Sequence, residues 1–222
     1  RKAGLTSFYG PTVMAGFAEN VEPFAYTLAA VRRTLFETDP VGVVEPNGDG
    51  WTDEFLQWGD KAARDRRRAV KPSEGPRMLQ GRGVVRGPLI GGCGEVLEML
   101  KGTPWWPPLE LWRGAILFYE TSEEAPKVHY VMRWLRNFGS QGILRELSGI
   151  IVGRPCGVDA RQRAEYDAAI VHALDEEGLI DLPVLANLDF GHTDPIFTLP
   201  YGIVAEIDSA AASLSLTESG VS

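Results

Sequence analysis

The stretch GAILFYE, residues 114–120, is a continuous apolar run that ends on a glutamate. The run has the length of a strand, and an uninterrupted apolar run predicts a strand that is buried on both faces of a sheet. Downstream, apolar side chains recur at the spacing of one helical face, at Val128, Val131, Met132, Leu135 and Phe138, and Gly139 ends the pattern. A buried strand followed by such a helix is typical of an α/β fold.

The same alternation extends to both sides of residues 114–120. Further strands are predicted at 81–92, 148–153 and 182–188, and further helices at 95–102 and 161–178. Two consecutive strands, 201–207 and 213–218, come last. Because strands alternate with helices and then follow one another directly, the sequence predicts an α/β domain with a mixed sheet and flanking helices over residues 82–222.

Two other segments precede this domain. Residues 1–38 are predicted to form an interdomain strand and a helix, with Asn20 as the helix cap and Pro23 in the first turn. The apolar stripe of this helix is expected at Phe24, Leu28, Val31 and Leu35. Glycine, proline and charged residues dominate residues 39–81, which are therefore predicted to be a long surface loop region with little regular structure.

Composition excludes several classes of function. The net charge of −8 argues against nucleic acid as the main partner. The chain has no apolar run of about 18 residues, so no membrane span is predicted. Two isolated cysteines favour a reducing compartment, and residues 1–11 lack the apolar core of a signal peptide, so we expect a cytoplasmic protein. The histidines show no metal-ligand spacing, so neither a metal nor another cofactor is predicted.

Two ionisable residues stand where α/β proteins usually carry their chemistry, at the C-terminal ends of strands. Glu120 ends the run 114–120, and His192 follows the strand 182–188. A carboxylate beside an imidazole fixes its tautomer, as the acid of a catalytic triad does. The alternative is that Glu120 opens a solvated turn with Glu123 and Glu124, while His192 forms a hydrogen bond to a loop.

A triad also needs a nucleophile, and none is evident from the sequence. No serine lies in a GxSxG elbow, and Ser122 is interpreted as a turn or capping residue. Cys93 begins a helix after a glycine turn, where the helix dipole would lower the pKa of a thiol. The other interpretation of Cys93 is a small buried cysteine.

Four motifs together resemble the LD-carboxypeptidase and microcin C immunity family of serine peptidases. In chain order they are GLTSFYGPTVMAGFAE (4–19), GPLIGG (87–92), ILFYETSEE (116–124) and LDFGHTDPIFTLPYGI (188–203). The resemblance implies a swivelling β/β/α-like C-terminal domain in which Glu120 is the triad glutamate and His192 is the general base. It also implies a homodimer.

The family's serine lies in an N-terminal domain, in a GYSD-like motif shortly before the stretch that matches residues 4–11. We therefore expect this chain to lack the nucleophile, to need that missing N-terminal domain as its partner, and to be inactive alone. The resemblance implies that the full-length protein hydrolyses an amide in a murein tetrapeptide or in a peptidyl or aminoacyl nucleotide. The alternative is a non-catalytic ligand-binding or interaction module that uses the tryptophan-bearing loop.

Three residues are candidates for substrate binding through the same resemblance. Trp58 stands where the microcin-immunity branch stacks a tryptophan on its substrate, and Trp51 is a helper; Trp58 could equally cap the core. Cys93 follows IGG where the family commonly has asparagine after GG, which changes the polar contact at this point. The basic run at 61–71 could approach a phosphate, or it could be a solvated loop.

Overall fold

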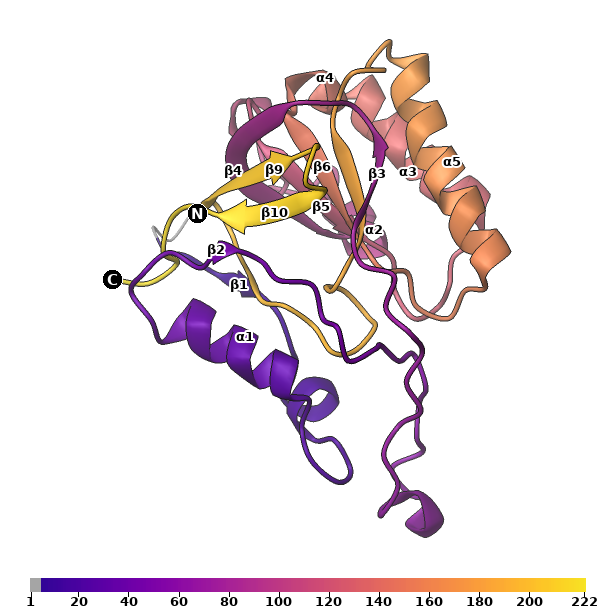
Figure 1. The fold of residues 1–222 in the computed structure, drawn as a ribbon. Helices are drawn as coiled ribbons and strands as arrows, with labels where there is room; N and C mark the ends of the chain where they lie inside the picture. Colours follow the sequence, from indigo (N-terminus) through magenta and orange to yellow (C-terminus); the bar gives the residue numbers. More distant parts are fainter. Residues whose placement is uncertain (1–4) are drawn as a thin grey trace.

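Eight strands form one mixed sheet in the computed structural model, which describes residues 5–222. The strand order is β2-β10-β9-β4-β5-β6-β7-β3 (Figure 1). The four central strands are parallel neighbours: β4 (Val84–Cys93), β5 (Ile116–Glu120), β6 (Gly149–Gly153) and β7 (Val184–Leu188). The outer strands pair antiparallel: β2 (Gly42–Val43), β3 (Arg77–Gln80), β9 (Val204–Asp208) and β10 (Ser213–Leu216). The predicted α/β fold with a mixed sheet and flanking helices is confirmed.

Helices cover both faces of this sheet. One core cluster joins the sheet to α2 (Gly94–Leu100), α3 (Val128–Ser140), α4 (Ile143–Glu146) and α5 (Ala160–Glu176). The other face packs near α1 (Ala25–Leu35), which lies across the sheet from α3 and α5 in Figure 1. Short elements complete the fold: β1 (Phe8–Tyr9) paired with β8 (Leu199–Pro200), η1 (Val13–Phe17), η2 (Lys61–Ala63) and η3 (Leu109–Leu111). No helix in residues 5–222 is long and apolar enough to cross a membrane.

Strand β5 is buried on both faces, as its apolar run predicted. Leu117 and Tyr119 belong to the core on the side of α3 and α5, whereas Ile116 and Phe118 belong to the core on the opposite side. Successive side chains of a strand point to opposite faces, so an unbroken apolar run supplies both cores at once. The last residue of the strand, Glu120, continues this alternation at the sheet's C-terminal edge.

The prediction for the face of α1 was wrong. The helix buries the small side chains Thr27, Ala30 and Thr34, and Leu28 in the predicted apolar stripe is 43% exposed. The hydroxyl of the buried Thr27 accepts a hydrogen bond from the backbone N–H of Ile196, so this polar group has a partner in the interior. Asn20 does not cap the helix; its side chain donates to the carbonyl of Ala63.

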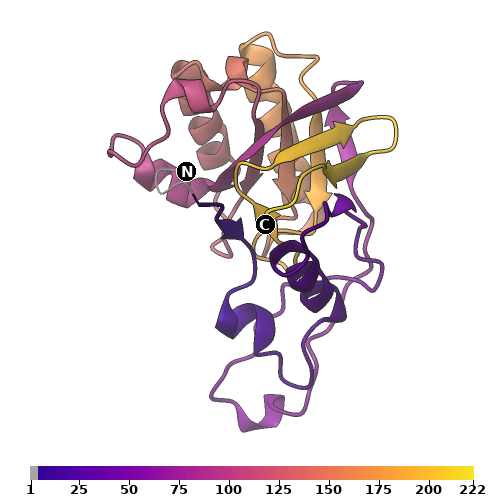
Figure 2. The same cartoon turned by 90° about the vertical axis from the view of Figure 1, so that its left-hand side faces the viewer.

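The loop region 39–81 is more regular than predicted at both ends. It contains β2 and the edge strand β3, and Val41 and Val44 belong to the core. Between these strands the chain leaves the sheet and extends away from it, with η2 near the tip (Figures 1 and 2). The domain boundaries at 38 and 81 stay a prediction, and residues 1–4, including Gly4 of the first motif, lie outside the described residues.

Candidate active site

Glu120 lies at the C-terminal end of β5, between neighbouring strand ends. It is paired in register with Cys93 of β4, and only 1% of its surface is exposed. His192 stands in the loop that follows β7, so two parallel strands of the same sheet deliver these residues to one edge. The carboxyl ends of parallel strands meet at one edge, which explains why residues distant in sequence can meet here.

The two side chains are in direct contact. The distance from Glu120 Oε2 to His192 Nδ1 is 2.8 Å. The other carboxylate oxygen, Oε1, accepts a hydrogen bond from the hydroxyl of Tyr9 on β1. With both oxygens engaged, the carboxylate is held in one orientation and fixes the imidazole through Nδ1. In the neutral imidazole this contact places the proton on Nδ1 and leaves Nε2 without one.

Two glycines make room for the buried carboxylate. A Cβ atom on Gly191 would stand 2.7 Å from Glu120 Oε2, and the residue has a φ of +106°, a conformation that side chains rarely adopt. A Cβ atom on Gly153 would stand 2.9 Å from the Cβ atom of Glu120. A glycine before His192 therefore has a steric explanation. Without a side chain at position 191, the backbone can pass close to Glu120, and the next residue, His192, lies beside the carboxylate.

The surrounding charges favour the protonated form of His192. The hydrogen bond to Glu120 raises the pKa of the imidazole above its usual 6.5, and the nearby charges of Glu120, Glu123 and Glu95 act in the same direction. Partial burial of the ring opposes this shift. Glu123, on the exposed turn after β5, lies 3.3 Å from Nε2, on the side of the ring away from Glu120.

A cavity opens beside the imidazole. Its walls come from β1, the end of β4, helix α2, the turn after β5 and the loop of His192. Cys93 and His192 both line it, whereas Glu120 lies behind His192 in the interior. The structure therefore brings together three of the five predicted site residues, since the ligand atoms of Cys93, Glu120 and His192 lie within 4.8 Å of one another.

Cys93 is a poor nucleophile in this environment. Burial raises the pKa of its thiol, and the charge of Glu120 adds to the effect. The thiol also contacts Glu95 Oε2 at 3.2 Å. Cys93, Glu120 and His192 are residue types that can bind a metal. Both oxygens of Glu120 have a partner within the chain, His192 Nδ1 at one and the Tyr9 hydroxyl at the other. The predicted absence of a metal stays a prediction.

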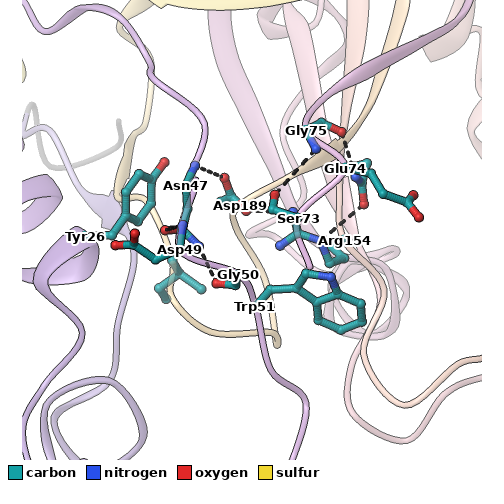
Figure 3. A network of polar contacts seen from close by, with 12 residues as sticks. Tyr26, Asn47, Asp49, Gly50, Trp51, Ser73, Glu74, Gly75, Arg154 and Asp189 are labelled. Carbon is teal, nitrogen blue, oxygen red and sulfur yellow. Dashed lines mark hydrogen bonds and ion pairs between the residues drawn. The ribbon is translucent and has the colours of Figure 1, made fainter. Parts of the chain in front are cut away.

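Trp51 belongs to a network of polar contacts (Figure 3) and does not line the cavity of His192. It is 4% exposed, and its ring NH donates to the carbonyl of Pro72. The guanidinium of Arg154 lies 5.1 Å from the ring centre and forms an ion pair of 2.7 Å with Asp189. These contacts attach the extended loop to the ends of β6 and β7, which makes Trp51 an anchor of that loop.

Trp58 does not line the cavity of His192 either. It is 56% exposed and lines a depression on the extended loop together with Met14, Phe55 and Arg68, none of which lines the cavity of His192. The basic run beside it is paired within the chain: Arg66 with Glu54, Arg67 with Glu22, and Arg68 with Glu19 and Asp194. The roles of Trp51 and Trp58 in substrate binding remain predictions.

Sequence reasoning missed several polar residues that line the cavity. Tyr9, Glu95 and Tyr201 were not singled out, and Glu123 and Glu124 were considered only as part of a solvated turn. Tyr9 and Tyr201 lie within the motifs 4–19 and 188–203, which was the one signal that pointed to them. Glu95 carries no such signal. Its role is visible only where its Oε1 accepts hydrogen bonds from the backbone and hydroxyl of Ser122.

The fold and the site define a class of protein, namely an α/β domain that carries a glutamate–histidine pair at the ends of its parallel strands. The family described as the LD-carboxypeptidase C-terminal domain matches residues 86–207, and the chain belongs to this family. It is 27% identical over 219 residues to the microcin C7 self-immunity protein MccF of Escherichia coli. It is also 27% identical over 217 residues to "Putative carboxypeptidase YocD" of Bacillus subtilis. These matches cover 98% and 96% of the chain but 60% of each relative.

Solved structures agree with this assignment. An MccF-like protein from Streptococcus pneumoniae in complex with AMP superposes with a TM-score of 0.83 at 28% identity, over 96% of this chain and 64% of that one. MccF in complex with aspartyl sulfamoyl adenosine gives a TM-score of 0.83 at 26% identity, over 100% of this chain and 63% of that one. The chain therefore spans less than two thirds of the relatives that it matches.

Proposed function

We propose that Glu120 and His192 are the acid–base half of a Ser–Glu–His triad in a peptidase that hydrolyses amide bonds. The single observation that carries this proposal is the 2.8 Å contact between Glu120 and Nδ1 of His192, a residue that lines the cavity. A carboxylate bound at Nδ1 leaves Nε2 as the base, which is the arrangement of the triad. Family membership supports the reaction class, because the family is described by carboxypeptidase activity.

The nucleophile in this proposal comes from an N-terminal domain outside the chain. Ser122 is the serine in the wall of the cavity, and its hydroxyl donates to Glu95 at 2.7 Å rather than to His192. The incoming serine would lose its hydroxyl proton to His192 Nε2 as its oxygen bonds to the substrate carbonyl carbon. His192 would then give that proton to the leaving amine, and water would hydrolyse the acyl-enzyme by the same proton transfers.

The substrate class in this proposal is a small peptide or an aminoacyl nucleotide. MccF has been solved with aspartyl sulfamoyl adenosine, and an MccF-like protein with AMP, which supports a compound that joins an aminoacyl group to a nucleotide. The names of other relatives refer to carboxypeptidases and support a peptide. The alternative of a non-catalytic module is not favoured by these names. Homodimer formation and a cytoplasmic location stay predictions.

The experiment is a hydrolysis assay on the full-length protein, with its N-terminal domain, and on residues 1–222 alone. Both are given an LD-linked tetrapeptide and an aminoacyl sulfamoyl adenosine. We expect the full-length protein to cleave at least one of them, the His192→Ala variant to lose the activity, and the isolated chain to be inactive. A full-length protein that cleaves neither compound, or that is unaffected by His192→Ala, would contradict the proposal.

A further inference from the structure

The loop that carries His192, residues 189–198, is held on one side of the histidine by Asp189. The carboxylate of Asp189 accepts a hydrogen bond from the backbone N–H of Asn47 at 2.8 Å (Figure 3) and forms the buried ion pair with Arg154. The side chain of His192 is itself partly exposed. Its position therefore depends also on how the two ends of its loop are held.

On the other side of the histidine, Asp194 is attached to the extended loop, residues 44–76, in two ways. The backbone N–H of Asp194 donates to the carbonyl of Thr52 at 2.9 Å, and the N–H of Thr52 donates to the carbonyl of Asp194 at 2.7 Å. The carboxylate of Asp194 forms an ion pair of 2.8 Å with the guanidinium of Arg68. The two loops are therefore joined two residues after His192.

The ion pair of Arg68 is largely shielded from water. The side chains of Arg68 and Asp194 are each 14% exposed, and that of Glu19, the second partner of Arg68, is 9% exposed. The guanidinium also lies over the ring of Phe24, 5.5 Å from the ring centre. Burial opposes the charge of Arg68, but the hydrogen bonds and charges of Glu19 and Asp194 outweigh it and raise the pKa of the guanidinium. Because removing one partner of a shielded pair leaves an unpaired charge, this contact joins the loops more firmly than an exposed pair would.

The neighbouring arginines do not make this connection. Arg66 pairs with Glu54 inside the extended loop, and Arg67 pairs with Glu22. Both arginine side chains are exposed. Of the arginines at 66–68, only Arg68 forms an ion pair with the loop of His192 in the part of the chain that the structure describes.

Building on the proposed function, in which His192 is the general base, we propose that Arg68 and Asp194 are positioning residues for His192. Their ion pair fixes the loop so that Nδ1 stays 2.8 Å from the carboxylate of Glu120. The residue before the histidine is Gly191, and a glycine backbone has more conformational freedom than any other, so an anchor after the histidine is needed. A displacement of about 1 Å in a catalytic group can lower a rate about a hundredfold, which is why a contact outside the cavity matters.

This role predicts an effect on His192 whose sign differs from that of a simple charge effect. The hydrogen bond to Glu120 is the largest contribution that raises the pKa of His192, and the charges of Glu123 and Glu95 add to it. When the loop loosens, the contact with Glu120 weakens and the pKa of His192 falls toward 6.5. Removing the positive charge of Arg68 without any movement would act in the opposite direction, because a nearby cation disfavours the imidazolium.

The test measures the pKa of His192 by NMR in residues 1–222 and in matched variants. Arg68→Gln removes a positive charge and Asp194→Asn a negative one, and we expect both to lower this pKa by about 0.5–1 unit. Charge effects alone would raise the pKa in Arg68→Gln and lower it in Asp194→Asn. Arg68→Lys keeps the charge and should restore most of the unmodified value. The control Arg66→Gln removes the same charge from an exposed pair of the same loop and should leave the pKa of His192 as it is.

A second measurement follows the contact itself. Asp194→Asn keeps the backbone pairing with Thr52, so this variant does not depend on Arg68→Gln being folded. We expect the NMR signal of the Nδ1 proton between His192 and Glu120 to be lost through faster exchange with water in Asp194→Asn and to persist in Arg66→Gln. On the full-length protein, Asp194→Asn should lower kcat about tenfold with little change in KM, because Asp194 does not line the cavity of His192.

The outcomes separate this inference from the proposed function. A pKa of His192 that rises or stays constant in Arg68→Gln, an Nδ1 proton that persists in Asp194→Asn, or an active full-length protein whose kcat Asp194→Asn does not change would overturn the inference and leave the proposed peptidase intact. A full-length protein that cleaves neither an LD-linked tetrapeptide nor an aminoacyl sulfamoyl adenosine would contradict the proposed function. The NMR measurements would then still decide whether Arg68 and Asp194 hold His192 in place.

Discussion

The carboxylate of Glu120 lies 2.8 Å from Nδ1 of His192, although the two residues are 72 positions apart in the sequence. The glutamate is buried and the histidine lines the cavity, so the pair extends from the interior to the cavity wall. The sheet creates this relationship by bringing the ends of β5 and β7 to the same edge.

The protonation of His192 should depend on two neighbouring carboxylates. Its pKa in the folded chain lies above 6.5 because the hydrogen bond to Glu120 stabilises the imidazolium, and Glu123 adds to this. We expect Glu120→Gln to lower this pKa strongly and Glu123→Gln to lower it less. Titration of the imidazole by NMR measures both shifts, with His172→Gln as the matched histidine control on α5. An imidazole that titrates alike in all variants would contradict the assignment.

The same pKa predicts how stability changes with pH. A group whose pKa is raised on folding stabilises the folded chain while it is protonated in both states, below its unfolded pKa of about 6.5. This contribution is lost as the pH rises through the higher folded pKa. We therefore expect the difference in unfolding free energy between the unmodified chain and His192→Gln to be largest at low pH. Denaturant unfolding at several pH values measures it, and a difference that grows toward alkaline pH would be the wrong sign.

We expect a side chain at position 191 to be unfavourable both because of its contact with Glu120 and because of the positive φ. A matched variant separates these two effects. A Cβ atom there meets Glu120 Oε2 at 2.7 Å and also needs a φ of +106°. Gly178 has a φ of +73°, with nothing within 4 Å of its Cβ position. We expect Gly178→Ala to cost about 1 kcal/mol of stability through backbone strain alone. Gly191→Ala should cost more and lower the activity of the full-length protein; equal effects of the two variants would show that the contact with Glu120 does not matter.

The two loop tryptophans should behave in opposite ways. Trp51 is buried against Arg154 and anchors the loop, so Trp51→Ala should destabilise the chain by about 3–5 kcal/mol. Trp58 is exposed on the loop, and Trp58→Ala should change stability by less than about 0.5 kcal/mol. Thermal and denaturant unfolding of the two variants provide the comparison. A larger loss for Trp58→Ala would contradict the positions of both side chains.

The thiol of Cys93 should react slowly. Burial and the charge of Glu120 raise its pKa, which leaves little thiolate at neutral pH. Burial likewise raises the pKa of Cys156 to about 11. We expect iodoacetamide at pH 8 to alkylate both cysteines much more slowly in the folded chain than in urea. Alkylation of Cys93 at the same rate in both conditions would restore it as a candidate nucleophile.

Local patterns predicted six of the eight strands of the sheet, but not β2 and β3, and they placed Glu120 and His192 at or just after strand ends. The apolar run at 114–120 specified a strand with two buried faces, and the placement of Glu120 and His192 at strand ends followed from strand boundaries. The contact between them was not derivable in the same way, because strand order is a property of the whole chain. The resemblance to a known family implied that Glu120 and His192 act together, and the structure shows the contact between them.

The features that the sequence could not reveal depend on contacts between distant segments. The buried face of α1 carries Thr27, Ala30 and Thr34, and the hydroxyl of Thr27 accepts a hydrogen bond from the backbone N–H of Ile196, 169 positions away. Trp51 and Arg154 meet only because the loop folds back over the ends of β6 and β7. Glu95 and Glu123 come together only because both line the cavity of His192. None of these contacts leaves a periodic signal in the sequence.

The central claim is that Glu120 and His192 act as one unit, and a double-mutant cycle on the full-length protein tests it most directly. The measurement is kcat/KM for Glu120→Gln, His192→Ala and the double variant on the best of the cleaved substrates. We predict that each single change lowers kcat/KM by about a thousandfold or more and that the double variant is little worse than either one. Losses that multiply in the double variant, or a Glu120→Gln variant with undiminished activity, would contradict the claim.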